Sequence, residues 1–175
     1  MKGRILLGLM LLVAVVFGAV VYYAQVYAYY TELPANGPAD VQLTARASGR
    51  PEPLAHENFR AIDAMSSPIR YRACFETKKS LEALSKTYLP YADAVPLNAP
   101  GWFACFDAAA IGEALEAGRA KAFLGQRDIK YGIDRVVAVT KDGRGYVWQQ
   151  INRCGRAVFN GRPAPANCPP PPEGY

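Results

Sequence analysis

The chain has 175 residues, 51% of them hydrophobic and 20% charged, a balance that excludes an intrinsically disordered protein. Its net charge is +5, and its length suits one anchor segment and one domain. The charge is uneven, because residues 32–118 carry 8 basic and 11 acidic side chains, whereas residues 119–162 carry 10 basic and 3 acidic ones. This basic C-terminal third could face anionic lipid headgroups or an acidic partner, or it could be an ordinary solvated surface.

The first 31 residues predict a transmembrane anchor that ends in a belt of tyrosines. Lys2 and Arg4 precede a run from Ile5 to Thr31 that contains no charged side chain. A helix needs about 20 apolar residues to cross about 30 Å of hydrocarbon. Tyrosine rings favour the headgroup boundary at the end of such a helix. The belt consists of Tyr22, Tyr23, Tyr27, Tyr29 and Tyr30.

The two cations before the apolar run also predict its orientation. By the positive-inside rule, Lys2 and Arg4 keep the N-terminus in the cytoplasm, so that the rest of the chain lies outside it. The competing interpretation is a signal peptide that is cleaved after Val26-Tyr27-Ala28. The apolar run is longer than the about 7–15 residues typical of a signal peptide, which favours an anchor that is not cleaved.

Residues 32–68 are expected to be a linker and lead-in to the folded domain. Leu33–Pro38 is rich in turn-forming residues. Phe59, Ile62 and Met65 are spaced three residues apart, which predicts one or two helical turns in the second half of this segment.

A short phrase occurs twice in residues 69–160, the predicted folded domain. Arg72-Ala73-Cys74-Phe75-Glu76 returns 31 residues later as Phe103-Ala104-Cys105-Phe106-Asp107. Each copy ends a predicted strand, residues 69–75 and residues 101–106, and each is followed by helical spacing. The repeat therefore predicts two successive strand–helix units, although so short a match can also arise by chance.

The end of the domain carries the strongest hairpin signal in the chain. Residues 135–140 and 146–151 are rich in β-branched and aromatic residues, and the turn between them contains Asp-Gly. The order strand, helix, strand, helix, hairpin predicts an α+β domain with a small mixed sheet and helices on one face. A proline-rich tail follows over residues 161–175, which cannot form a helix or a central strand.

The four cysteines favour two disulfides in a domain outside the cytoplasm. We expect Cys74 to pair with Cys105, which would join the two copies of the repeated phrase. We expect Cys154 to pair with Cys168, which would hold the tail. The chain has no C-x-x-C pair of the kind that thiol–disulfide enzymes use, and no short cysteine or histidine spacing typical of a zinc or haem site.

The sequence predicts no catalytic residue, no cofactor site and no metal site. It contains no nucleophile elbow, phosphate-binding loop, zinc-protease motif or dinucleotide fingerprint. In the basic C-terminal third we select as possible interaction residues Arg144, Trp148, Arg153 and Arg156. Aromatic and basic residues together could suggest nucleic-acid binding, but a location outside the cytoplasm argues against such a partner.

Three stretches of the chain, Gln25–Tyr30, Asp40–Thr44 and Ser67–Phe75, resemble those of a family of short single-span membrane proteins from alphaproteobacteria. The resemblance would cover nearly the whole chain. It implies a bacterial inner-membrane protein with a periplasmic domain, and it brings no known activity and no site residue.

The leading hypothesis is a non-enzymatic interaction module, namely an accessory subunit or assembly factor of an inner-membrane complex. It depends on the anchor, the lack of catalytic motifs, the basic C-terminal third and the proline-rich tail. Two alternatives remain open. One is a thiol–disulfide or metal-related redox protein, which requires a reactive free thiol, and the other is an extracytoplasmic ligand-sensing domain that acts through a partner.

Overall fold

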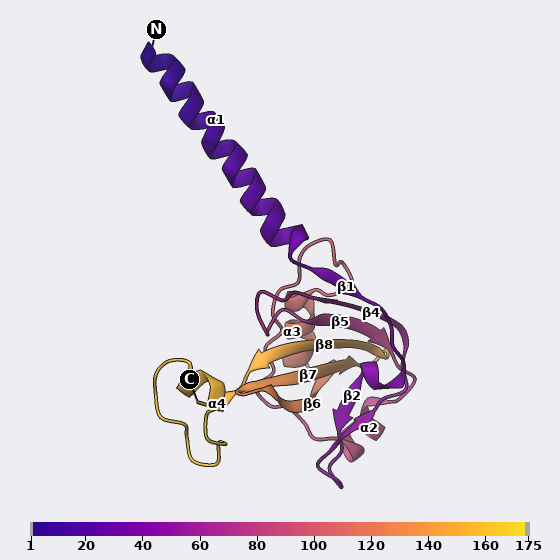
Figure 1. Cartoon of the computed structure of the whole chain (residues 1–175). Helices are drawn as coiled ribbons and strands as arrows, with labels where there is room; N and C mark the ends of the chain where they lie inside the picture. The colour runs from indigo at the N-terminus through magenta and orange to yellow at the C-terminus, as the bar shows by residue number, and fades with distance from the viewer. Residues whose placement is uncertain (1, 174–175) are drawn as a thin grey trace.

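The N-terminal segment is one continuous helix that projects from the rest of the molecule (Figure 1). The computed structural model describes residues 2–173, and in it α1 (Lys2–Tyr23) runs directly into the π-helical turn η1 (Ala24–Ala28). The apolar side chains of α1 are exposed along its length. The stretch Gly3–Ala28 is long and apolar enough to cross a membrane, a criterion that a signal sequence also meets.

A six-stranded sheet forms the body of the domain, and each of its neighbouring strand pairs is antiparallel. In spatial order the strands are β1 (Thr31–Leu33), β4 (Glu57–Asp63), β5 (Arg72–Glu76), β8 (Arg144–Ile151), β7 (Ile133–Thr140) and β6 (Ala120–Lys130). The α+β class is confirmed, but the sheet is antiparallel where we expected a mixed one.

The antiparallel pairing follows from the connections between the strands. Parallel neighbours need a crossover connection, which usually contains a helix. The excursion that carries α2 (Leu81–Thr87) and α3 (Ala108–Glu116) joins β5 to β6, and these two strands are separated in the sheet by β8 and β7. The helices therefore cover the sheet without placing two parallel strands side by side.

Alternate residues of the central strands point to opposite faces of the sheet, and each face has its own core. In β7, Val137 and Val139 pack into the first core, whereas Val136 and Ala138 pack into the second. The first core includes residues from α2 and from the small sheet of β2 (Gln42–Thr44) and β3 (Pro51–Pro53). The second core includes residues from α3 and the loop before it, so the two helices cover opposite faces of the sheet and not one face as we expected.

Residues 32–68 contribute elements to the folded domain, although their composition indicated a linker. They contain β1 to β4 and the short 3-10 helix η2 (Pro38–Asp40). The stretch around Phe59 is the strand β4, so the prediction of helical turns there is wrong. Ala61 and Ile62 are both buried, but they lie in different cores. Successive residues of a strand point to opposite faces, which accounts for this burial, whereas a helix would bury only one face.

The second predicted strand, residues 101–106, is instead a loop of successive turns. The Phe103 N–H donates to the Pro100 carbonyl at 2.9 Å, and the Phe106 N–H donates to the Phe103 carbonyl at 3.2 Å. Phe103 and Phe106 are both buried in the second core, whereas a strand would point residues three apart to opposite faces. The repeated phrase is therefore a strand in its first copy and a pair of turns in its second.

Both expected disulfides are present. Cys74 of β5 is joined to Cys105 of the loop before α3, with 6.3 Å between the two Cα atoms. Cys154 is joined to Cys168 with a Cα separation of 5.7 Å. The first bond fastens the loop to the sheet, and the second fastens the tail to the short helix α4 (Arg153–Val158), which the sequence had not indicated.

The predicted hairpin is formed by β7 and β8. Gly143 in the connecting turn has a φ of 87°, a left-handed conformation that favours glycine. The carbonyl of Gly143 accepts a hydrogen bond from the Thr77 N–H at 2.8 Å. This contact holds the turn against the end of β5.

The helix α4 is held in place by a close contact between two glycines. The Asn152 Oδ1 caps the helix by accepting the Gly155 N–H at 3.0 Å. Gly132, in the turn between β6 and β7, lies directly against Gly155, so that a Cβ added to either residue would collide with the backbone of the other. This contact fixes α4, with its two arginines, against the β6–β7 turn.

The glycine contact can be tested with a matched pair of substitutions. Gly155→Ala should lower the free energy of unfolding by about 1–3 kcal/mol, because the added methyl group overpacks a backbone contact. Gly112→Ala, inside α3 with no neighbouring atom within 4 Å of the added Cβ, should raise it by about 0.4–1 kcal/mol. Urea unfolding followed by circular dichroism measures both changes, and equal effects at the two positions would contradict the packing described.

Candidate functional site

An open pocket of about 360 Å³ lies beside the C-terminal tail, where the β6–β7 hairpin, α4 and the segment after α2 meet. Three arginines line it: Arg127 of β6, and Arg153 and Arg156 of α4. Tyr91 and Asp134 also line it. We call this the arginine pocket.

The carboxylate of Asp134 is buried, and protein donors occupy it. The residue is 2% exposed. Its Oδ1 accepts the Asp128 N–H at 3.0 Å and the Asn152 Nδ2 at 2.8 Å, and its Oδ2 accepts the Tyr91 hydroxyl at 3.1 Å. These three hydrogen bonds replace the hydrogen bonds to water that the carboxylate loses when it is buried.

The neighbouring carboxylate of Asp128 is also engaged inside the protein. Its Oδ1 accepts the Gly132 N–H at 3.1 Å and the Asn152 Nδ2 at 3.0 Å. Asp128 has a φ of 46°, a left-handed conformation that aspartate tolerates better than most residues. Asn152 therefore bridges two carboxylates with its amide group while its oxygen caps α4.

Tyr91 belongs to this hydrogen-bond network and also lines the pocket. Its burial raises the pKa of its phenol well above the usual value, and the charge of Asp134 and the hydrogen bond to it act in the same direction. The positive charges of Arg156 and Arg127 lower the pKa of the same phenol. Both guanidinium groups therefore act electrostatically on one point in the pocket.

The three arginines differ from these carboxylates, because none of them forms an ion pair within 4 Å among residues 2–173. Arg153 donates one hydrogen bond, at 3.3 Å, to the Ala166 carbonyl of the tail. Asp93 is a further carboxylate that lines the pocket. The arrangement offers exposed guanidinium groups, which bind carboxylates and phosphates through paired hydrogen bonds.

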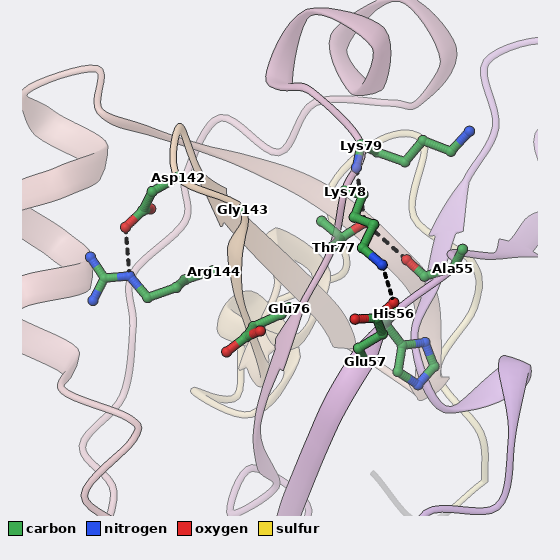
Figure 2. A pocket seen from close by; sticks show the side chains of 10 residues that line it. All are labelled: Ala55, His56, Glu57, Glu76, Thr77, Lys78, Lys79, Asp142, Gly143 and Arg144. Atoms are coloured by element: carbon green, nitrogen blue, oxygen red, sulfur yellow. Dashed lines mark hydrogen bonds and ion pairs between the residues drawn. The ribbon is translucent and has the colours of Figure 1, made fainter.

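A second pocket, of about 540 Å³, lies at the opposite ends of the strands and contains Arg144 (Figure 2). We call it the strand-end pocket. Its charges are mostly paired with one another: Lys78 with Glu57 at 2.5 Å, and Arg144 with Asp142 at 2.8 Å. Because these cations already have partners, the strand-end pocket offers less to an anionic ligand than the arginine pocket does.

The single histidine, His56, also lines the strand-end pocket. Its Nδ1 lies 2.8 Å from the Leu54 carbonyl, which can only accept, so this nitrogen carries the proton. The ring packs against Phe59 and Phe75. Across residues 2–173, no three His, Cys, Asp or Glu side chains are grouped so that they could hold a metal ion.

The predicted tyrosine belt surrounds the point where the helix meets the domain. Tyr22, Tyr23, Tyr27 and Tyr29 are exposed, whereas Tyr30 is half-buried. The contacts at this point involve Trp102, which the sequence analysis had not selected. Its Nε1 donates to the Val26 carbonyl of η1 at 2.7 Å, and its ring meets the Tyr30 ring edge-on at 6.2 Å.

The four predicted interaction residues do not form one surface. Arg153 and Arg156 lie together in the arginine pocket, and Arg144 lies in the strand-end pocket. Trp148 is fully buried in the second core, so it cannot contact a partner in this conformation. Arg127 was missed, because only the folded hairpin brings it next to α4.

Comparison with known proteins identifies a family without assigning an activity. Residues 41–169 match a family of unknown function (DUF6446), and the chain belongs to that family. No curated protein and no solved structure matches the chain. The matched region includes both disulfides and both pockets described above.

The hydrogen bond at the floor of the arginine pocket leads to a testable change in stability. Tyr91→Phe removes the hydroxyl that donates to Asp134, and it should lower the free energy of unfolding by about 1–2 kcal/mol at pH 7. Tyr29→Phe, at an exposed ring, should change it by less than about 0.5 kcal/mol. Urea unfolding in a mild detergent measures both variants.

The same substitution should lose its effect at alkaline pH. The pKa of Tyr91 is raised in the folded protein, so the unfolded chain releases this proton first as the pH rises past about 10. The contribution of Tyr91 to stability is therefore complete below pH 10 and declines above it, by up to about 1.4 kcal/mol per pH unit. The difference in stability between the native chain and Tyr91→Phe should therefore shrink as the pH rises from about 10 to about 11, and a constant difference over this range would contradict the network.

Proposed function

We propose that this member of the family of unknown function is a membrane-anchored interaction module outside the cytoplasm, an accessory subunit or assembly factor of an inner-membrane complex. In this proposal α1 is an uncleaved anchor, and Lys2 and Arg4 keep its N-terminus in the cytoplasm. The arginine pocket binds an acidic segment of a protein partner. The domain holds this pocket in the periplasm close to the membrane.

The location rests on the helix and the disulfides. The stretch Gly3–Ala28 is long and apolar enough to span a bilayer, and the domain carries two disulfides with no free cysteine in the described part of the chain. Disulfides persist in oxidising compartments and are rare in the cytosol. The contact between Trp102 and the Val26 carbonyl supports a domain that stays attached to its helix.

We infer the binding function from one observation, namely that the carboxylates of Asp134 and Asp128 have hydrogen-bond partners within the protein whereas the arginines of the same pocket have no ion-pair partner among the residues that the structure describes. The carboxylates of Asp134 and Asp128 are engaged by protein donors. The guanidinium groups of Arg127, Arg153 and Arg156 project without an ion pair to any residue between 2 and 173. A partner that supplies carboxylates would complete this pairing.

The chemistry of the pocket supports binding rather than a catalysed reaction. A guanidinium group stays protonated in proteins, so it can orient an anion but cannot act as a base. Tyr91 holds its proton firmly, because its pKa is raised and its hydroxyl donates to Asp134. The adjacent cysteine, Cys154, is joined to Cys168 and fastens the tail.

Binding of an acidic peptide to the full chain tests this proposal. The chain is placed in nanodiscs of phosphatidylcholine, which has no net charge, and binding of a fluorescent peptide with a run of glutamates is measured by anisotropy. The triple variant Arg127→Gln, Arg153→Gln, Arg156→Gln should weaken binding by about tenfold, as expected for the loss of three exposed ion pairs. Added salt should also weaken binding of the peptide by the native chain, because salt screens the attraction between exposed charges.

A variant with the same change in net charge provides the control. Lys78→Gln, Lys79→Gln, Arg144→Gln removes three cations from the strand-end pocket, where Lys78 and Arg144 are already paired. Its affinity for the peptide should stay within about twofold of the native value, since attraction by net charge alone is weak and screened. Equal losses in the two triple variants, or no binding by the native chain, would overturn the proposed pocket.

A further inference from the structure

One apolar side chain of the domain is fully exposed. Met65 has a relative exposure of 106%, the highest among the exposed large apolar residues of the described chain. It lies in the connection between β4 and β5, beside Ser66 and Ser67. Transfer of such an apolar side chain out of water is favourable, and no residue between 2 and 173 covers Met65.

The pairing of β1 with β4 places this connection next to the end of the helix. Thr31 lies opposite Asp63, so the residues that follow Asp63 continue toward the residues that precede Thr31. Met65 therefore lies on the side of Tyr29, which is itself exposed. The other end of the connection is fixed there as well, because the Arg70 guanidinium lies 5.6 Å from the centre of the Tyr30 ring.

The connection is held in shape by its own hydrogen bonds. The Asp63 Oδ1 accepts the Ala64 N–H at 2.7 Å. The Ser67 N–H donates to the Ala64 carbonyl at 3.4 Å, and the Arg70 N–H donates to the Ser67 carbonyl at 3.3 Å. These two successive turns keep Met65 pointing outward instead of letting it fold back on the sheet.

The position of the domain relative to the helix is held from another side by Trp102. Its Nε1 donates to the Val26 carbonyl of η1, and its ring contacts Tyr30. Figure 1 shows the loop before α3 reaching up to the end of α1. The aromatic belt, the Trp102 loop and the Met65 connection therefore meet at the place where the helix leaves the domain.

We propose that the Met65 connection is a membrane-contacting element, in which Met65 inserts into the headgroup boundary of the bilayer that holds α1 and Arg70 binds a lipid phosphate. This inference rests on the proposed membrane anchor. Aromatic and apolar side chains are stabilised in the boundary layer, and guanidinium groups bind phosphate oxygens there. With α1 as one attachment and Met65 as a second, the domain lies on the membrane surface instead of swinging on its helix.

A fluorescent label at position 65 tests the contact. Because all four cysteines form disulfides, Met65→Cys introduces a single reactive thiol, and the exposed site should tolerate the change without loss of folding. The full chain is labelled with a polarity-sensitive fluorophore and reconstituted in phosphatidylcholine vesicles. Brominated acyl chains should quench the fluorescence of this label at least about threefold more than that of the control, because insertion by about 5–10 Å brings the label to the acyl chains.

The matched control is Asp142→Cys, which is exposed in the turn between β7 and β8. That turn lies at the other end of the strands, about 20 Å away at about 3.3 Å per residue. Equal weak quenching at the two positions would overturn the membrane contact. A label at position 65 that is shielded from water but not quenched by brominated lipid would also overturn it, because a second copy or a partner protein would then cover Met65.

A separate measurement distinguishes failure of this contact from failure of the anchor. The vesicles are washed with alkaline carbonate, which should leave a membrane-spanning chain in the lipid. A chain that is washed off would contradict the proposed anchor itself. A chain that stays in the lipid with an unquenched label at position 65 would contradict only the Met65 contact.

Discussion

The buried guanidinium of Arg72 is the interaction on which the arrangement of the domain depends most. The residue is 3% exposed, and it donates to the backbone carbonyls of Ile69, Tyr71, Leu97 and Asn98 at 2.7–3.0 Å. Burial lowers its pKa to about 10, which leaves the group charged at neutral pH. A buried cation is stable only where polar groups replace its water. The loop that supplies two of these carbonyls must therefore close over the sheet.

That loop belongs to the long segment between α2 and α3, which contacts the N-terminal helix, the sheet and the arginine pocket. Toward α3, Cys105 fastens it to β5, and Trp102 reaches the helix end. In its middle, the side chain of Gln150 of β8 both donates to and accepts from its backbone. Toward α2, Tyr91 forms the floor of the arginine pocket with Asp134. A single irregular segment thus positions the contact with the N-terminal helix and the arginine pocket on one sheet.

The parts of the fold that sequence could predict are those set by local or counting rules. The β7–β8 hairpin follows from β-branched strands around Asp-Gly, and the cysteine pairing follows from number and position. Spacing failed where buried residues on two faces imitate a helix, as in Phe59 and Ile62, and where Phe103 and Phe106 pack from turns. Arg127 lies next to the arginines of α4 because the glycine contact fixes α4 against the β6–β7 turn, and no local sequence pattern reports that contact.

In the proposed arrangement, the segment between α2 and α3 fixes the domain to its helix, which gives the arginine pocket a defined position relative to the proposed membrane anchor. Pulsed dipolar spectroscopy tests it directly on the full chain in nanodiscs, with spin labels at Val16→Cys in α1 and Lys130→Cys at the end of β6. We predict a narrow distance distribution that broadens in Trp102→Ala, which loses the hydrogen bond to the Val26 carbonyl. A distribution that is equally broad with and without Trp102 would contradict a fixed connection between the domain and its helix.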